Sequence, residues 1–186
     1  MHTSLVPEPI KLNYQDFCAL PDDGRRYEIL DGDLYMSPSP ATLHQRVVGR
    51  LLVLLSEHVR QMNLGEVFVA PYDVLLDEQN IVEPDLIYVA NANVSIITEK
   101  NIQGAPDLLV EIVSPSTIER DTRDKRNLYA RCAVPNYWII DPRRTSVIEL
   151  RHVDKAYGAV AELSGDATWT PVIFPQLQIK LQDLWR

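Results

Sequence analysis

Cysteine is scarce in this sequence, and the spacings that build soft metal sites are missing. Only two cysteines occur among the 186 residues, Cys18 and Cys132, and they are far apart. One disulfide at most is therefore possible, and both a disulfide framework and a cysteine zinc site are excluded. The four histidines are scattered, and no H-E-x-x-H pattern is present.

Long apolar runs are also absent. The longest one, from Leu51 to Leu55, is far too short to span a bilayer. The N-terminus lacks the basic stretch followed by an apolar run that marks a signal peptide. We therefore expect a cytoplasmic protein that does not contact a membrane.

Positive charge is in deficit over the chain as a whole. Eighteen Lys and Arg residues face 26 Asp and Glu residues, which gives a net charge of −8 and argues against a protein that coats nucleic acid non-specifically. The charge is uneven, however. Between Thr117 and Arg144, seven basic residues stand against four acidic ones, so this segment is locally positive by three.

The length and the hydrophobic pattern predict one α/β domain over residues 1–186. Asp31-Gly32 predicts a hairpin. Gly65 is expected to end a long amphipathic helix, and Ser116 with Glu119 has the spacing of a capping box.

The predicted helices are Asn13–Leu20, Leu43–Met62 and Thr117–Cys132. The predicted strands are Arg26–Leu30, Asp33–Met36, Val67–Leu76, Val82–Ala90, Asp107–Val113 and Tyr137–Ile140, followed by a β-rich C-terminal part from Ser146 with turns near Asp154 and Gly165. This order favours a mixed sheet with helices on both faces.

Two of the predicted strands contain a carboxylate among apolar residues. Alternation places Asp85 on one face with Ile87 and Val89, and it places Glu111 on one face with Leu109 and Val113. A buried, unpaired carboxylate costs several kcal/mol, and two in one pocket repel each other. A hard divalent cation such as Mg²⁺ or Mn²⁺ removes both problems. Pairing with arginine, or a position in water at a strand end, is the alternative for each carboxylate.

Lys125 is the third candidate. In a helix its neighbours form a largely apolar stripe that includes Ile118, Leu128 and Tyr129, so the ammonium group is expected to point toward the sheet. The alternative is an ion pair with Asp121, four residues earlier, on an exposed face. The two arrangements are compatible with each other.

These residues resemble the PD-(D/E)XK nuclease superfamily, whose members share a restriction-endonuclease-like fold. More closely, the sequence is similar to the bacterial Uma-type family of restriction endonucleases. The resemblance runs from about Tyr14 to Trp185. The motifs that carry it are Tyr27–Gly32, Glu83–Leu86, Pro106–Thr117 and Asn136–Pro142.

The resemblance implies a site and a mechanism. Asp85 and Glu111 would ligate a Mg²⁺ or Mn²⁺ ion, together with the carbonyl oxygen of Ile112, and DNA would be the substrate. The superfamily pattern has a lysine two residues after the glutamate, where this sequence has Val113. In the Uma-type family the lysine lies on the next helix, at the position of Lys125, where it would orient water or stabilise developing charge.

Glu28 and His44 are further catalytic candidates, each with a structural alternative. Glu28 lies beside the hairpin turn and can approach the metal from there, or it can pair with Arg25 or Arg26. His44 falls on the buried stripe of the long helix. A core histidine that bonds to a backbone group is one explanation, and a functional one, which the family's histidine at this position keeps open, is the other.

The function predicted from the sequence is therefore a metal-dependent endonuclease that hydrolyses phosphodiester bonds of DNA, and a homodimer is expected. The main alternative is a catalytically silent nuclease-like fold that binds nucleic acid or another protein. A metal hydrolase for small phosphate esters is a weaker option, because no phosphate-cradling glycine loop is present.

Overall fold

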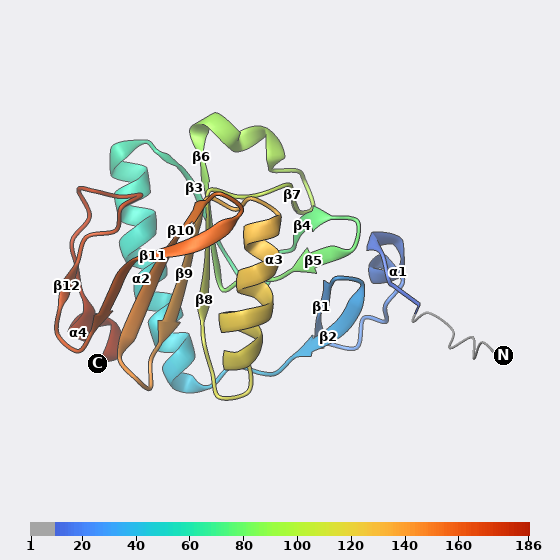
Figure 1. Ribbon diagram of the computed structural model, residues 1–186, viewed down its shortest axis with the longest axis horizontal. Helices are drawn as coiled ribbons and strands as arrows, with labels where there is room; N and C mark the ends of the chain where they lie inside the picture. Colours follow the sequence, from blue (N-terminus) through green and yellow to red (C-terminus); the bar gives the residue numbers. More distant parts are fainter. Residues whose placement is uncertain (1–9) are drawn as a thin grey trace, which may run out of the picture.

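A six-stranded mixed sheet forms the centre of the molecule (Figure 1). A computed structural model describes residues 10–186. The strand order is β11-β10-β9-β8-β6-β3, in which β8 and β9 are parallel and all other neighbours are antiparallel. The mixed character agrees with the sequence prediction. The strands are β3 (Gly65–Val69), β6 (Leu86–Ala90), β8 (Leu108–Ile112), β9 (Asn136–Asp141), β10 (Ser146–Val153) and β11 (Ala156–Ser164).

A smaller sheet, with strand order β2-β1-β5-β4-β7, lies beside this central sheet. The predicted hairpin is confirmed at its start. Asp31 and Gly32 both have positive φ angles, 52° and 76°, as a two-residue hairpin turn requires. The strands are β1 (Arg26–Leu30), β2 (Asp33–Ser37), β4 (Val74–Asp77), β5 (Asn80–Val82) and β7 (Ile102–Gln103).

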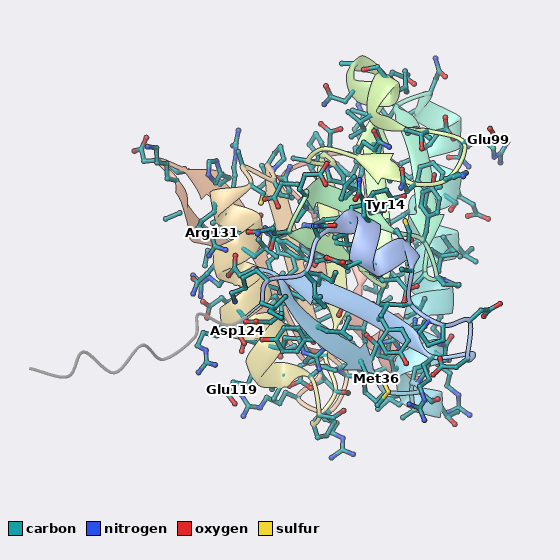
Figure 2. The ribbon with its side chains drawn as sticks, turned by 90° about the vertical axis from the view of Figure 1, so that its right-hand side faces the viewer. Tyr14, Met36, Glu99, Glu119, Asp124 and Arg131 are labelled. Carbon is teal, nitrogen blue, oxygen red and sulfur yellow. The ribbon has the colours of Figure 1, made fainter. Side chains whose placement is uncertain are left out.

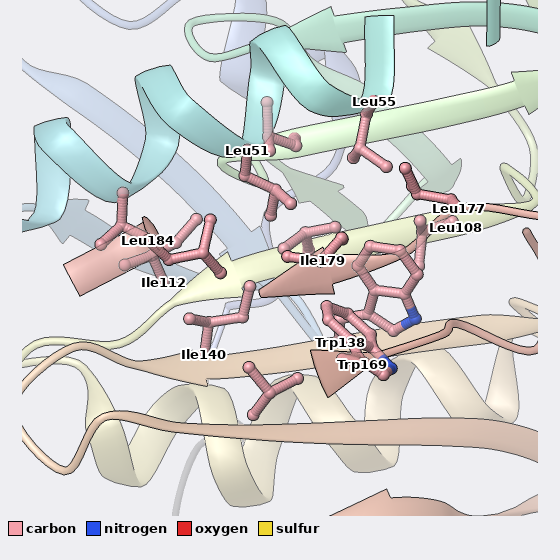
Figure 3. Packing of buried hydrophobic residues seen from close by; sticks show 14 of the residues in the cluster. Leu51, Leu55, Leu108, Ile112, Trp138, Ile140, Trp169, Leu177, Ile179 and Leu184 are labelled. Atoms are coloured by element: carbon pink, nitrogen blue, oxygen red, sulfur yellow. The ribbon is translucent and has the colours of Figure 1, made fainter. Parts of the chain in front are cut away.

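One face of the central sheet is covered by α2 (Thr42–Met62) and by the C-terminal segment, which contains β12 (Thr168–Trp169), β13 (Ile179–Lys180) and α4 (Leu181–Trp185). Figure 3 shows Leu51 and Leu55 of α2 above the sheet residue Leu108, with Trp169 beside Trp138. The apolar stripe predicted for the long helix is buried here.

The opposite face of the central sheet is covered by a second helix and by the smaller sheet. Leu128 and Tyr129 of the helix pack with Leu109 and Tyr137 of the central sheet and with Val82 of the smaller sheet. Helices therefore cover both faces, as predicted from the sequence. This helix consists of a π-helical part (Arg120–Lys125) followed by α3 (Arg126–Arg131).

The start of the second helix differs from the prediction. The capping box between Ser116 and Glu119 does not form. Thr117 Oγ1 instead accepts the backbone N–H of Ser114, and the Glu119 carboxylate lies 2.6 Å from Arg123. A turn that ends at Thr117 replaces the expected first helical residue, and the helix starts at Ile118. A short π-helical segment is uncommon and often occurs at functional sites.

Two predicted strands are each divided into two. Val67–Leu76 becomes β3 and β4, which belong to different sheets, and Val82–Ala90 becomes the end of β5 and β6. Pro71 and Pro84 lie in the two gaps, and proline cannot donate a hydrogen bond to a neighbouring strand. The division at Pro84 places Asp85 just before β6.

The prediction that Gly65 ends the long helix is wrong. Helix α2 ends at Met62, its capping residue Asn63 has a φ of 51°, and Gly65 is the first residue of β3. A Cβ at Gly65 would meet the carbonyl oxygen of Val89 at 2.0 Å. Glycine is therefore required by the close approach of β3 to β6 rather than by the end of the helix.

Several shorter elements complete the fold. Asn13 caps α1 (Tyr14–Cys18) as predicted, and the predicted C-terminal turns occur at Asp154 and Gly165. The 3-10 helix η1 (Asn91–Ile96) and α4 were not predicted. The expectation about a signal peptide concerns residues 1–9, which lie outside the described part. No helix within residues 10–186 is long and apolar enough to cross a membrane.

Candidate functional site

Every site residue predicted from the sequence lines one cavity of about 170 Å³. Its walls come from the β1–β2 hairpin, the start of α2, the segment before β6, the end of β8 and the start of the second helix. The predicted residues are Glu28, His44, Asp85, Glu111, Ile112 and Lys125. Segments that are more than ninety residues apart in the sequence therefore meet at one place.

Glu111 lies near the end of β8, on the face that the second helix covers. Leu109 and Val113 pack on this face with Tyr129, which contacts Glu111, so the three residues share a face as alternation predicted, and Glu111 is 5% exposed. Its Oε1 accepts hydrogen bonds from Lys125 Nζ at 2.8 Å and from the Tyr129 hydroxyl at 2.9 Å. Burial raises the pKa of Glu111 well above its usual value. Lys125 opposes this rise, while Asp121, Asp85 and Glu28 add to it.

Lys125 points inward from the second helix, as predicted. Its side chain is 4% exposed, and Nζ lies 2.7 Å from Glu28 and 2.8 Å from Glu111. Burial alone would lower the pKa of Lys125. The three carboxylates Glu111, Glu28 and Asp121 outweigh burial and hold this pKa well above its usual value. The ammonium group is therefore a fixed positive charge at neutral pH.

Asp121 is buried in this cluster. The sequence indicated it only as an exposed alternative partner for Lys125. Its carboxylate is 5% exposed and lies 3.9 Å from Nζ of Lys125. Burial raises the pKa of Asp121, and Lys125 opposes the rise. The four-residue spacing puts both side chains on one helix face. That spacing, combined with the inward prediction for Lys125, was the signal that could have revealed a buried Asp121.

Asp85 does not occupy the strand position that alternation assigned to it. It lies in the bend before β6, and its side chain is 14% exposed. Asp85 Oδ2 accepts the backbone N–H of Ile112 at 2.8 Å. Because the N–H and C=O of a strand residue point to the same side, the carbonyl oxygen of Ile112 also faces Asp85. Asp85, Ile112 and Glu111 thus converge from two neighbouring chain segments.

His44 lies in the first turn of α2 and its partner is a carboxylate. Its Nε2 donates to Asp85 Oδ2 over 3.0 Å, and its buried Nδ1 has no partner within the described residues. The observed hydrogen-bond partner of His44 is therefore not the backbone group that the structural alternative predicted. His44 instead helps to fix the orientation of Asp85.

Glu28 is almost fully buried and points into the cavity from β1. It does not pair with Arg25 or Arg26, which bind Asp23 and Glu83. Its oxygens contact four groups: Lys125 Nζ, Arg120 Nη1, the backbone N–H of Glu83 and the Ser37 hydroxyl. With both oxygens engaged in this way, Glu28 anchors Lys125.

Two further charged residues in the cavity were not selected from the sequence. Glu83 immediately precedes Pro84, and burial raises its pKa to about 7, a rise that Arg26 opposes. Arg120 lies 3.6 Å from Glu28, and its guanidinium group stacks over the Tyr35 ring at 5.1 Å. A cation over an aromatic face is attracted to it. Neither residue had a distinguishing sequence pattern beyond its position beside a motif.

The donor groups around the cavity fit a hard divalent cation. Asp85 and Glu111 each engage one oxygen with protein donors, and their other oxygens, Asp85 Oδ1 and Glu111 Oε2, form no hydrogen bond with the described part of the chain. No three acidic, histidine or cysteine side chains in residues 10–186 form a complete metal cluster. Mg²⁺ commonly needs only one or two carboxylates and retains several waters.

Comparisons with known proteins identify the family and a similar fold. The sequence matches the Uma2 family, described as "Putative restriction endonuclease", over residues 14–182. No curated protein matches it significantly. The fold is similar to that of a solved structure from Anabaena variabilis, described as a putative nuclease belonging to DUF820, with a TM-score of 0.76 and 19% sequence identity over 95% of this chain and 98% of that one. The likeness to the solved structure shows the fold, and this chain belongs to the Uma2 family, whose description supports a nuclease function.

Proposed function

We propose that this protein is a metal-dependent endonuclease that hydrolyses phosphodiester bonds of DNA, with its catalytic centre in the cavity between Asp85, Glu111 and Lys125. One observation carries the proposal. Asp85 and Glu111 each leave one oxygen without a hydrogen-bond partner among residues 10–186, and the buried ammonium group of Lys125 lies 2.8 Å from the other oxygen of Glu111. Carboxylate oxygens are preferred ligands of Mg²⁺ and Mn²⁺.

The charge balance around Lys125 also supports a bound cation. Glu28, Glu111 and Asp121 all contact a single ammonium group, and Glu28 is the only carboxylate within residues 10–186 that pairs with Arg120. Buried carboxylates that outnumber their cationic partners raise one another's pKa. An additional divalent cation would offset this excess of negative charge.

Asp85, Glu111 and the carbonyl oxygen of Ile112 would hold this cation. When bound, it supplies Lewis-acid stabilisation of the phosphate and lowers the pKa of water. His44 and the Ile112 N–H hold Asp85 in place, and Tyr129 does the same for Glu111. These contacts orient the oxygens before the substrate arrives, which is a requirement for electrostatic catalysis.

Lys125 would act as a fixed positive charge rather than as a base. Its carboxylate neighbours hold its pKa well above the usual value, so it does not give up a proton near neutral pH. The ammonium group is an N–H donor that orients the attacking water and stabilises negative charge as it develops on the phosphate. Glu28 and Asp121 position this donor.

Plasmid nicking with Mg²⁺ or Mn²⁺ tests the proposal. The wild-type protein is compared with Asp85→Ala, and with Asp183→Ala as a matched control that removes an exposed aspartate on α4. We expect Asp85→Ala to lose about 10³-fold of the nicking rate, because the cation loses a ligand. Asp183→Ala should nick at the wild-type rate.

Nicking that Asp85→Ala leaves unchanged would remove the proposed mechanism. Metal binding without cleavage of any nucleic acid would instead favour the alternative predicted from the sequence, a silent nuclease-like fold that binds nucleic acid or protein. The same assay with RNA tests the choice of DNA as the substrate.

A cytoplasmic homodimer is part of the proposal. Two copies, each with one site, would allow both strands of a duplex to be cut, and small homo-oligomers commonly have two-fold symmetry. Sedimentation of the purified protein, with and without DNA, measures this directly. A monomer under both conditions would contradict it.

A further inference from the structure

A second hollow lies on the outer side of the helix that carries Lys125. It is a groove of about 560 Å³ between the helix and the turn that joins β10 to β11. In Figure 1 the β10–β11 hairpin lies close to the end of α3, in front of the central sheet. Arg126 bridges the two walls, because its Nη2 donates to the backbone oxygen of Tyr157 over 3.3 Å.

The charge of this groove is opposite to that of the molecule. Four basic residues line it, Arg123, Arg126, Arg131 and Lys155, and no acidic residue among the described ones does. The whole chain has a net charge of −8. The catalytic cavity differs as well, since five carboxylates line it beside its three basic residues. The groove is therefore a local concentration of positive charge.

Two of these cations have no carboxylate partner. Arg126 and Lys155 form no ion pair with any residue in the described range 10–186, whereas Arg123 pairs with Glu119 and Asp124. Arg131 pairs with Asp31, and both side chains are more than half exposed. Exposed pairs of this kind contribute little to stability, so an incoming anion can compete for these arginines.

The groove and the catalytic cavity are on two sides of the same helix. Arg120 and Lys125 face the cavity, whereas Arg123 and Arg126 face the groove. Figure 2 shows Glu119, Asp124 and Arg131 in sequence along the outer edge of this helix, beside the β1–β2 hairpin. The helix therefore separates the two sites, and a DNA strand that occupied both would pass around it.

We propose that this groove binds the phosphodiester backbone of a DNA strand that is held for cleavage in the cavity. The inference rests on the proposed function for its choice of ligand. Arginine and lysine supply most phosphate contacts in protein–DNA complexes, and a neutral side chain such as Asn127 adds hydrogen bonds. The groove thus concentrates DNA on a protein whose net charge would otherwise repel it.

Binding of a fluorescent DNA duplex, measured by anisotropy in EDTA at several salt concentrations, tests the groove. The test variant is Arg126→Gln/Lys155→Gln. The matched control is Arg60→Gln/Lys100→Gln, which changes the net charge by the same amount but alters exposed residues outside the groove. Circular dichroism and thermal unfolding of each variant show that the fold is retained.

We expect the test variant to bind DNA at least tenfold more weakly than the wild type at low salt. Each phosphate contact contributes about −0.9 to the slope of log K against log salt, so the slope should become shallower by about 2. The control should bind within about twofold of the wild type. The single variant Arg126→Lys, which keeps the positive charge, should retain most of the wild-type affinity for DNA.

Equal binding by the test and control variants would overturn the inference. So would displacement of the DNA by polyglutamate at the same charge concentration, since that result would identify the groove as a site for acidic protein segments. Because binding in EDTA requires no hydrolysis, its outcome is independent of plasmid nicking. A protein that binds DNA through the groove but never cuts it would contradict the proposed function alone.

Discussion

Glu111 and Glu149 are two buried glutamates on opposite faces of the same six-stranded sheet. They belong to β8 and β10, with only β9 between these strands, and they are 5% and 1% exposed. Glu149 faces the C-terminal segment, where Trp169 Nε1 and the Val172 N–H donate to its two oxygens at 2.9 Å and 2.7 Å. Both of its oxygens have neutral donors, and Glu149 does not line the catalytic cavity.

The environment of Glu111 differs in kind. It lines a cavity with four other carboxylates, it shares its ammonium partner with Glu28 and Asp121, and one of its oxygens has no hydrogen bond within residues 10–186. The comparison shows that burial of a carboxylate does not by itself indicate function. An excess of like charge around a cavity costs stability that a purely structural site would avoid, and the proposed catalytic centre has such an excess.

The largest expected difference between the two glutamates is in catalysis. Glu111→Gln should reduce Mg²⁺-dependent plasmid nicking by about 10³-fold, because a neutral amide is a poor ligand for a hard cation. Glu149→Gln, assayed well below its unfolding temperature, should nick within about twofold of the wild type. Similar losses in both variants would show that the two sites do not differ in the way proposed.

The next largest effect is on stability, and here the change at Glu149 is expected to cost more than the change at Glu111. Glu149→Ala leaves the donors of Trp169 and Val172 without an acceptor, so the free energy of unfolding should fall by about 3 kcal/mol. Glu111→Gln in EDTA should change it by less than about 1 kcal/mol, because the amide oxygen still accepts from Tyr129 and one excess charge is removed. Urea denaturation at pH 7 measures both values. A greater loss for Glu111→Gln would reverse the comparison.

The smallest effect concerns pH. Burial raises the pKa of Glu83 to about 7 in the folded protein, from an ordinary value near 4.5. A raised pKa in the folded state stabilises the protein below about pH 4.5, and this contribution is lost as the pH rises to about 7. In EDTA, the melting temperature of Glu83→Gln minus that of the wild type should therefore increase by a few degrees between pH 5 and pH 8. A constant or decreasing difference would mean that the charge of Glu83 does not destabilise the folded protein.

The positions of Glu111 and Lys125 could be predicted from sequence periodicity. The period of two in β8 placed Glu111 on the covered face, and the helical spacing around Lys125 placed its ammonium group inward. Both inferences depend only on local geometry and on the apolar character of the neighbours. The hairpin at Asp31-Gly32 was equally accessible, because few residue pairs adopt two consecutive positive φ angles.

Other features depend on contacts that local patterns do not encode. Asp85 reaches the cavity from a bend, and its position is fixed by His44 and the Ile112 N–H, which are 41 and 27 residues away in the sequence. Asp121 entered the prediction only as an exposed partner in the alternative for Lys125, because nothing in the helix itself shows that Glu28 approaches Lys125 from the hairpin. Gly65 was given a local role, whereas the carbonyl of Val89 on the neighbouring strand is what excludes a side chain there.

The most direct test of the central claim is the anomalous scattering of crystals grown with Mn²⁺. The account predicts one strong manganese peak in the cavity, within bonding distance of Asp85 Oδ1, Glu111 Oε2 and the carbonyl oxygen of Ile112, and no such peak in crystals of Asp85→Ala. A cavity without manganese at millimolar concentrations of the ion, or a peak held by other residues, would contradict it.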